Sequence, residues 1–244
     1  MTKPDPFIAK MIKTTVCGVS GRMGGLIARL IAENKNFSLV GAVEKIDHPE
    51  LGKEIEGIEI ICDLAKVIGE SDVVIEFTAP SATLKHLAIC GKKNVPVVIG
   101  TTGFSQEEIG EIRTISEKIP VLLSPNMSLG VNLLFKLVKE AATILKNYEV
   151  EIVETHHNKK KDAPSGTAKK IAEIVGDVPI HSLRFGNVIG EHRVIFAGKS
   201  ERLELFHRAE NRETFARGAL KAAAFIVNQK PALYSMENLL NDAI

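Results

Sequence analysis

Neither sign of charge predominates in this sequence, which has 31 lysine and arginine residues against 30 aspartate and glutamate residues and a formal net charge of +1. A chain of this balance has no overall positive field that would attract nucleic acid or an anionic membrane surface. Recognition of an anion must therefore depend on a local arrangement of donors. The sequence indicates neither a nucleic-acid partner nor a membrane partner.

Cysteine is scarce, and long apolar runs are missing. The cysteines Cys17, Cys62 and Cys90 are odd in number and form no CxxC pair, which argues against a disulfide framework and suits a reducing compartment. Lysine and proline interrupt the apolar residues of the N-terminal segment MTKPDPFIAKMIK, and no run of about 18 apolar residues occurs. We therefore expect a cytoplasmic protein without a signal peptide or a membrane span. Internal repeats are also missing, which argues against a solenoid.

Short β-branched segments alternate with amphipathic segments in the first half of the chain. The segments TTVCGV, SLVGAV, VVIEF, VPVVIG and PVLLS are separated by stretches of helical periodicity such as RMGGLIARLIAEN. This alternation predicts an α/β fold with a Rossmann-like parallel sheet that is wound on both faces. Nearly continuous apolar runs such as VPVVIG are typical of strands that are buried on both sides.

The pattern changes after Asn126. A long helical segment from Val131 to Leu145 is followed by strand-like YEVEIVET, a polar loop, a short helix that opens at Ser165, and the closely spaced strands RVIFAG and ERLELFHRA. Close spacing of strands predicts antiparallel pairing. We expect a dinucleotide-binding domain over residues 1–126 and a C-terminal α+β domain with a mainly antiparallel sheet over residues 127–230. The terminal segment 231–244 is expected to pack back on the first domain.

A glycine-rich turn follows the first strand. The run from Gly18 to Gly24, with the sequence GVSGRMG, lies between TTVCGV and a segment of helical periodicity. Glycines permit close approach of the backbone to a pyrophosphate, and the start of a helix offers unpaired N–H groups. The spacing is GxxGxxG, with Ser20 where the commoner GxGxxG motif has glycine. The turn therefore fits a dinucleotide site, although tight strand–helix packing alone explains it too.

The second strand ends at Glu44 and Lys45. An acidic residue in this place normally binds the adenosine ribose hydroxyls. A carboxylate repels a 2′-phosphate, whereas a neighbouring lysine attracts one, so the pair predicts use of NADH with tolerance of NADPH. The alternative is a charged strand end followed by a solvated loop.

Two further strand ends carry small and hydroxyl residues at the same predicted edge of the sheet. Phe77 and Thr78 follow VVIE, and the run from Gly100 to Gly103 follows VPVVI. Ligands of open α/β sheets lie at the carboxyl ends of strands. The second turn also has a capping-box spacing, with Ser105 before a helix and Glu108 three residues later. A ligand site and a helix cap are compatible here.

The densest cluster of functional groups runs from Glu151 to Ala168 and joins a strand end to a helix start. Pro164 precedes Ser165-Gly166-Thr167, whose N–H and hydroxyl groups could hold a carboxylate at the start of the helix. Two histidines and three lysines just before this segment add positive charge, and a histidine exchanges protons near neutral pH.

Other interpretations of this cluster are possible. The lysines alone fit a solvated loop, and a serine before a helix is often only its cap. The adjacent histidines lack an HExxH motif and would point to opposite faces of an extended strand end, which argues against zinc. Ser165 lacks the GxSxG motif of a nucleophilic serine. We expect no metal in this protein.

The residues from Glu151 to Ala168 resemble the signature of the 4-hydroxy-tetrahydrodipicolinate (dihydrodipicolinate) reductase family, E-[IV]-x-E-x-H-x3-K-x-D-x-P-S-G-T-A, at every specified position. The motifs GxxGRMG, FTxP, GTTG and SPNMS and the run H-R-A-x-x-R-x-x-F-A-x-G-A from His207 to Ala219 are also similar to that family. The resemblance spans roughly residues 14–240.

The resemblance implies roles for individual residues. His156 would donate or accept a proton, Lys160 would donate one and steady the substrate, and His157 would bind the substrate. Gly166 and Thr167 would hold a substrate carboxylate. The cofactor residues implied by the resemblance or by strand-end position are Gly18, Val19, Ser20, Gly21, Arg22, Met23, Glu44, Lys45, Phe77, Thr78, Gly100, Thr101, Thr102, Ser124, Pro125, Asn126 and Met127.

The sequence departs from the family pattern at two positions. Lys45 stands where several members have arginine, and lysine lacks the bidentate fork, which argues against a strong preference for NADPH. Phe185 stands where relatives more often have a glycine, in the loop after Arg184.

The implied reaction uses NADH and/or NADPH to reduce a small cyclic dicarboxylate to tetrahydrodipicolinate in diaminopimelate and lysine biosynthesis. The 4-hydroxy substrate loses water to form the conjugated imine that is reduced. The resemblance also implies a homotetramer assembled through the second domain, which would bind the substrate as well. Two alternatives are another reductase on the same fold and a non-catalytic dinucleotide sensor. Neither alternative requires His156 and Lys160 beside a site for a carboxylate.

Overall fold

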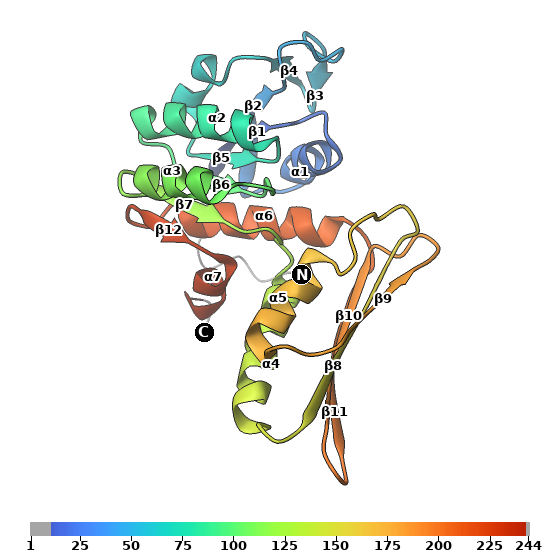
Figure 1. Cartoon of the computed structure of the whole chain (residues 1–244). Helices are drawn as coiled ribbons and strands as arrows, with labels where there is room; N and C mark the ends of the chain where they lie inside the picture. Colours follow the sequence, from blue (N-terminus) through green and yellow to red (C-terminus); the bar gives the residue numbers. More distant parts are fainter. Residues whose placement is uncertain (1–10, 243–244) are drawn as a thin grey trace. The chain divides into compact units, whose positions relative to one another are not determined.

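The computed structural model describes residues 11–242, and these form two compact units. The first unit contains residues 11–127 and 215–242, and the second contains residues 128–214 (Figure 1). Residues 215–230, which the sequence places in the second expected domain, thus pack with the first unit. Their helix has many small buried residues, and Gly218 has no Cβ that would collide with the carbonyl of Met127. The roles expected for the two domains, dinucleotide binding for the first and substrate binding and assembly for the second, remain predictions.

The first unit is built on an eight-stranded sheet with the order β12-β7-β6-β5-β1-β2-β4-β3. All neighbouring strands are parallel except β3 and β4, which confirms the expected Rossmann-like sheet. The sequence does not predict β3, β4 and β12, since runs of two to four residues show too little alternation. The strands are β1 (Ile12–Cys17), β2 (Phe37–Val43), β3 (Glu54–Ile55), β4 (Ile58–Ile61), β5 (Val73–Glu76), β6 (Val97–Ile99), β7 (Pro120–Leu123) and β12 (Ala232–Tyr234).

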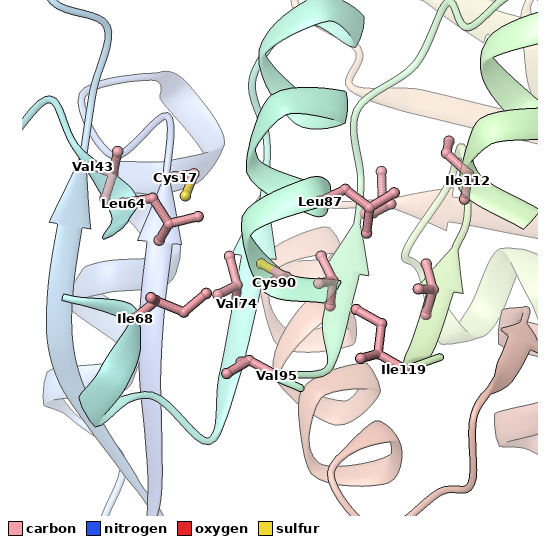
Figure 2. Close-up of a cluster of buried hydrophobic side chains, with 13 residues drawn as sticks. Cys17, Val43, Leu64, Ile68, Val74, Leu87, Cys90, Val95, Ile112 and Ile119 are labelled. Atoms are coloured by element: carbon pink, nitrogen blue, oxygen red, sulfur yellow. The ribbon is translucent and has the colours of Figure 1, made fainter. Parts of the chain in front are cut away.

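Apolar side chains cover both faces of this sheet. Val74 on one face belongs to a core with Leu87 and Cys90, and Figure 2 shows these side chains together. Val16 and Ile75 on the opposite face are also fully buried. The helices of this unit are α1 (Arg22–Ala32), α2 (Pro80–Lys93), α3 (Gln106–Ser116), α6 (Glu213–Ile226) and α7 (Met236–Asp242), with the 3-10 turns η1 (Leu64–Lys66) and η2 (Ile68–Glu70). Helix α6 begins two residues before the boundary between the units.

The second unit contains a four-stranded sheet with the order β11-β10-β8-β9. Strand β10 is antiparallel to β8 and β11, as expected, while β9 is parallel to β8. Ile152 and Phe196 of the sheet pack with Val138 and Ile171 of two helices. The elements are α4 (Leu129–Ile144), β8 (Glu149–His156), α5 (Gly166–Val175), β9 (Ile180–Arg184), β10 (Gly190–Ala197) and β11 (Arg202–Ala209). Within residues 11–242, no helix has the length and apolar character needed to cross a membrane.

Candidate active site

The glycine-rich turn links β1 closely to α1. Gly18 has a positive φ of 77°, and a Cβ there would collide with the carbonyl of Phe77. A Cβ on Gly24 would collide with the carbonyl of Gly18. Helix α1 begins at Arg22, and its N-terminus has no side-chain cap at Gly21 and no acidic residue in its first turn. Its first N–H groups and the positive end of its dipole thus suit an anion such as a pyrophosphate.

Glu44 is held against this turn. The backbone N–H of Ser20 donates to one carboxylate oxygen at 3.1 Å, and the backbone N–H of Lys45 donates to the other at 2.9 Å. The structure therefore places the acidic residue beside the turn, which fits a role in binding ribose hydroxyls. Lys45 is exposed, so its ammonium group is accessible from solvent.

The other predicted cofactor residues follow neighbouring strands of the same sheet. The turns after β5, β6 and β7 contain Phe77 and Thr78, residues 100–102, and residues 124–127, respectively. The backbone N–H of Thr78 donates to the hydroxyl of Thr101 at 3.1 Å, which links two of these turns. The structure thus brings the residues to one edge of the sheet. Met127 is buried.

A buried polar cluster lies next to these turns. Glu76, the last residue of β5, is fully buried, and one of its oxygens lies 2.6 Å from Nδ1 of His86. The hydroxyls of Thr78 and Thr83 donate to its other oxygen at 2.9 and 3.4 Å. Burial lowers the pKa of His86, but the hydrogen bond and charge of Glu76 outweigh this effect and raise it overall. Sequence reasoning missed this cluster, although a glutamate within the apolar run VVIEF is a signal for it.

The same cluster includes the thiol of Cys17. One possible ligand atom from each of Cys17, Glu76 and His86 lies within 4.8 Å of the others. Burial and the neighbouring Glu76 raise the pKa of the Cys17 thiol well above its usual value. The hydrogen bonds of Glu76 with His86, Thr78 and Thr83 make this cluster a buried hydrogen-bond network.

The second unit places His156 at the end of β8 with its ring largely buried. Its Nδ1 lies 2.5 Å from a carboxylate oxygen of Glu154, which is fully buried. Burial alone would raise the pKa of Glu154, but hydrogen bonds from Arg184, Ser182 and His156 lower it to about 2. Burial also lowers the pKa of His156. Glu154 is therefore an ionised partner for the predicted proton-transfer histidine.

The loop after β8 carries the other predicted side chains. The ammonium group of Lys160 lies 2.9 Å from the carboxylate of Asp162, and this hydrogen bond lowers the pKa of Asp162. His157 is half-buried, and among residues 11–242 its Nδ1 has no hydrogen-bond partner. A buried polar atom without a partner needs an explanation, and a bound ligand would supply one.

Ser165 caps α5 directly after this loop. Its hydroxyl accepts a hydrogen bond from the N–H of Ala168 at 3.2 Å, while its own N–H donates to Glu154. The helix starts with Gly166 and Thr167, and its first turn contains no acidic residue. A Cβ on Gly166 would meet nothing within 4 Å, so a carboxylate can approach this N-terminus. The cap role of Ser165 and the predicted anion site are thus compatible.

Sequence reasoning also missed two histidines of the sheet, His192 and His207. His192 on β10 lies opposite Glu154 in register, and its Nε2 is 3.2 Å from the hydroxyl of Ser165. Its ring centroid is 5.2 Å from that of His156. Burial and the neighbouring His156 lower the pKa of His192 to about 3, so it is neutral at physiological pH. His207 on β11 is the register partner of His192, and burial lowers its pKa too.

Comparison with known proteins shows that both halves of the chain match one family. Residues 12–127 match the model of the N-terminus of dihydrodipicolinate reductase, and residues 130–240 match the model of its C-terminus. A 4-hydroxy-tetrahydrodipicolinate reductase from Syntrophus aciditrophicus is 42% identical, over 94% of this chain and 98% of the relative. One from Caldanaerobacter subterraneus is also 42% identical, with the same coverage.

Solved structures show the same relationship. A dipicolinate-bound dihydrodipicolinate reductase from Paenisporosarcina sp. TG-14 is 28% identical and superposes with a TM-score of 0.79, covering 93% of this chain and 99% of the other. An amine dehydrogenase from Mycobacterium smegmatis reaches a TM-score of 0.69 over 94% and 96% of the two chains at only 12% identity. The second likeness concerns the fold alone.

Proposed function

Because this chain belongs to the dihydrodipicolinate reductase family, we propose that the residues described above perform the reduction of 4-hydroxy-tetrahydrodipicolinate to tetrahydrodipicolinate and water. The protein is an oxidoreductase of diaminopimelate and lysine biosynthesis. Its cofactor is a pyridine nucleotide, for which the N-terminal half of the chain matches the family model.

The nucleotide would lie at the carboxyl edge of the first sheet. The N-terminus of α1 would hold the pyrophosphate, and Glu44 would accept hydrogen bonds from the adenosine ribose. Lys45 directly follows Glu44, so its ammonium group would attract a 2′-phosphate on the same ribose, but lysine lacks the guanidinium fork of arginine. Both NADH and NADPH are therefore proposed to work, with NADH somewhat favoured.

The substrate would bind through its carboxylates in the second unit. Gly166 and Thr167 at the start of α5 would hold one carboxylate, and His157 would contact the substrate. The bound dihydronicotinamide supplies a hydride to the conjugated imine. The electron-rich nitrogen–carbon system that results needs a proton, and His156 and Lys160 are the proposed donors.

The observation that carries this proposal is that Glu154 contacts both halves of the substrate site. It lies beside Nδ1 of His156 and accepts a hydrogen bond from the N–H of Ser165, the cap of α5. A proton-transfer group and a helix N-terminus that suits a carboxylate are thereby held together. The dipicolinate of the structure from Paenisporosarcina is a planar dicarboxylate, which is the ligand class that such a site fits.

Oxidation of NADH by the purified protein tests the proposal. The unstable substrate is made in the assay from aspartate semialdehyde and pyruvate by a synthase, and absorbance at the dihydronicotinamide band is followed. We expect oxidation that depends on all three additions and that pyridine-2,6-dicarboxylate inhibits competitively. Binding of NADH without any turnover would instead favour the dinucleotide sensor.

Assembly and location complete the proposal. The family resemblance implies a homotetramer that is formed through the sheet of the second unit. Phe206, on the sheet face away from α4 and α5, is 45% exposed and would be covered in such an assembly. Sedimentation of the purified protein measures this assembly. We propose the cytoplasm as the location of the protein.

A further inference from the structure

We propose that Glu154 and Arg184 are positioning residues that together fix the ring of His156 and hold the N-terminus of α5 beside it. The inference deepens the proposed function and rests on it, because it concerns how the proposed proton donor is oriented. Neither residue is expected to touch the substrate.

Both oxygens of Glu154 are used by donors from different parts of the second unit. One oxygen accepts from Nη2 of Arg184 at 2.6 Å and from the N–H of Ser165 at 3.2 Å. The other lies 2.5 Å from Nδ1 of His156 and accepts from Nη1 of Arg184 at 2.9 Å. A carboxylate with this many hydrogen bonds and no exposure is ordered, so it can hold its partners in place.

The arrangement determines which ring nitrogen of His156 is available. An ionised carboxylate can only accept hydrogen bonds, so Nδ1 of His156 must carry a hydrogen. Nε2 is left for proton exchange. A Cβ on Gly190 would lie 3.1 Å from Nε2, so the absence of a side chain there leaves Nε2 room.

Arg184 compensates the buried charge and connects it to the loop. The position of Arg184 follows from the parallel register of β8 and β9, in which Arg184 is the partner of His156. Its Nη1 and Nη2 also donate to the carbonyls of Leu183 and Asp162, each at 2.7 Å. Because Asp162 pairs with Lys160, the guanidinium contacts the loop that carries the second proposed proton donor.

The two residues act on His156 with opposite signs. The groups that face its ring are Glu154 on β8, Arg184 on β9, His192 on β10 and Lys160 in the loop. Burial lowers the pKa of His156, Glu154 raises it, and Lys160 and Arg184 lower it further. His192 stays neutral and adds no charge above about pH 3. Removal of the carboxylate or of the guanidinium should therefore shift the titration of His156 in opposite directions.

The pH dependence of kcat/KM in the holoenzyme tests this expectation with Glu154→Gln and Arg184→Gln. If protonated His156 is the donor, the rate falls as pH rises through its pKa. We expect this midpoint to move down by roughly one pH unit in Glu154→Gln and up by a similar amount in Arg184→Gln. Turnover by Glu154→Gln should fall by roughly tenfold to a hundredfold, while KM for NADH stays near that of the parent.

Matched controls remove an exposed ionic contact in the same unit. Glu173→Gln and Lys170→Gln each break the exposed pair that these two residues form on α5. Both controls should keep the midpoint and turnover of the parent. Midpoints of Glu154→Gln and Arg184→Gln that move in the same direction, or not at all, would overturn the proposal.

Nitrogen NMR of the histidine rings provides a readout that needs no turnover. Neutral His156 should be the tautomer with hydrogen on Nδ1 in the parent, and this preference should be lost in Glu154→Gln. Glu154→Gln could fail to fold because it leaves the charge of Arg184 uncompensated. In that case the double variant Glu154→Gln with Arg184→Gln, which removes both charges, is measured in its place. A parent-like tautomer in either variant overturns the positioning role. If the parent has the fixed tautomer of His156 but shows no turnover, the proposed function is contradicted and the positioning role is not.

Discussion

Replacement of His86 by leucine should destabilise the first unit, because it removes the basic partner of Glu76. The carboxylate is fully buried, and after His86→Leu the hydroxyls of Thr78 and Thr83 and the protonated thiol of Cys17 would remain near it, but no basic group from this cluster would. Leucine fills much of the space of the imidazole ring, so the cavity contribution is small. The main cost is therefore a buried carboxylate without its basic partner.

The size of this effect follows from the burial of the pair. The histidine side chain is 17% exposed and the glutamate 0%, so solvent screens the interaction only slightly. Loss of one partner from a buried pair costs about 3–5 kcal/mol, and the lower value suits a site with two additional hydroxyl donors. A loss of about 3 kcal/mol lowers Tm by roughly 6–12 °C for a chain of this size.

Urea unfolding followed by circular dichroism at several pH values measures this free energy. The pKa of His86 is raised in the folded protein, so the stabilisation is full below the unfolded pKa of about 6.5 and declines as pH rises through the folded pKa. The difference between parent and His86→Leu should thus be largest near pH 6 and smaller at alkaline pH. A difference that grows with pH would refute this reasoning.

An exposed pair of the same residue types provides the control. Nε2 of His181 lies 3.0 Å from the carboxylate of Glu151, and both side chains are about half exposed. His181→Leu should change the free energy of unfolding by less than about 1 kcal/mol. The double variant Glu76→Gln with His86→Leu should recover part of the loss, because it removes the buried charge. Equal stability of the parent and His86→Leu at pH 6 would show that the pair is not stabilising.

Three further predictions concern the proposed site. Lys45→Ala should raise the Kd of NADPH more than that of NADH in fluorescence titrations, and equal changes would mean that Lys45 does not meet the 2′-phosphate. His156→Ala and Lys160→Ala should each lower kcat by roughly two orders of magnitude or more with little change in the Kd of NADH; a fully active double variant contradicts both roles. Thr167→Val should weaken binding of pyridine-2,6-dicarboxylate roughly tenfold to a hundredfold in calorimetry, as expected for a hydrogen bond to a charged group. Unchanged affinity would move the carboxylate site elsewhere.

Local patterns were sufficient to predict the first strand, turn and helix of the first unit. The strand before Gly18, the glycine-rich turn and the helical periodicity after Arg22 are continuous in the sequence, and the structure has β1, the turn and α1 at these places. Placement of the turns of Thr78 and Thr101 at one edge follows from parallel strands alone. Their hydrogen bond depends on side-chain positions, which the pattern does not specify.

Side-chain interactions between different elements could not be predicted in this way. Glu76 and His86 are on a strand and a helix, and only the packing of α2 on the sheet brings them together. Similarly, β9 is short, and its apolar residues Ile180 and Leu183 are three positions apart, so the sequence lacks the strict alternation that predicts a strand. Arg184 therefore had no predicted connection with the loop of His156.

The register of the second sheet explains why the long signature alone does not define the site. Glu154, His156 and Ser165 all lie within that signature, and the first two share a strand face because they are two residues apart. Arg184 lies outside it and reaches Glu154 only because β9 pairs with β8 in one particular register. A shift of that pairing by one residue would turn Arg184 to the other face of the sheet. The buried carboxylate would then lack its compensating charge, so the geometry around His156 depends on the pairing of β9 as much as on the signature itself.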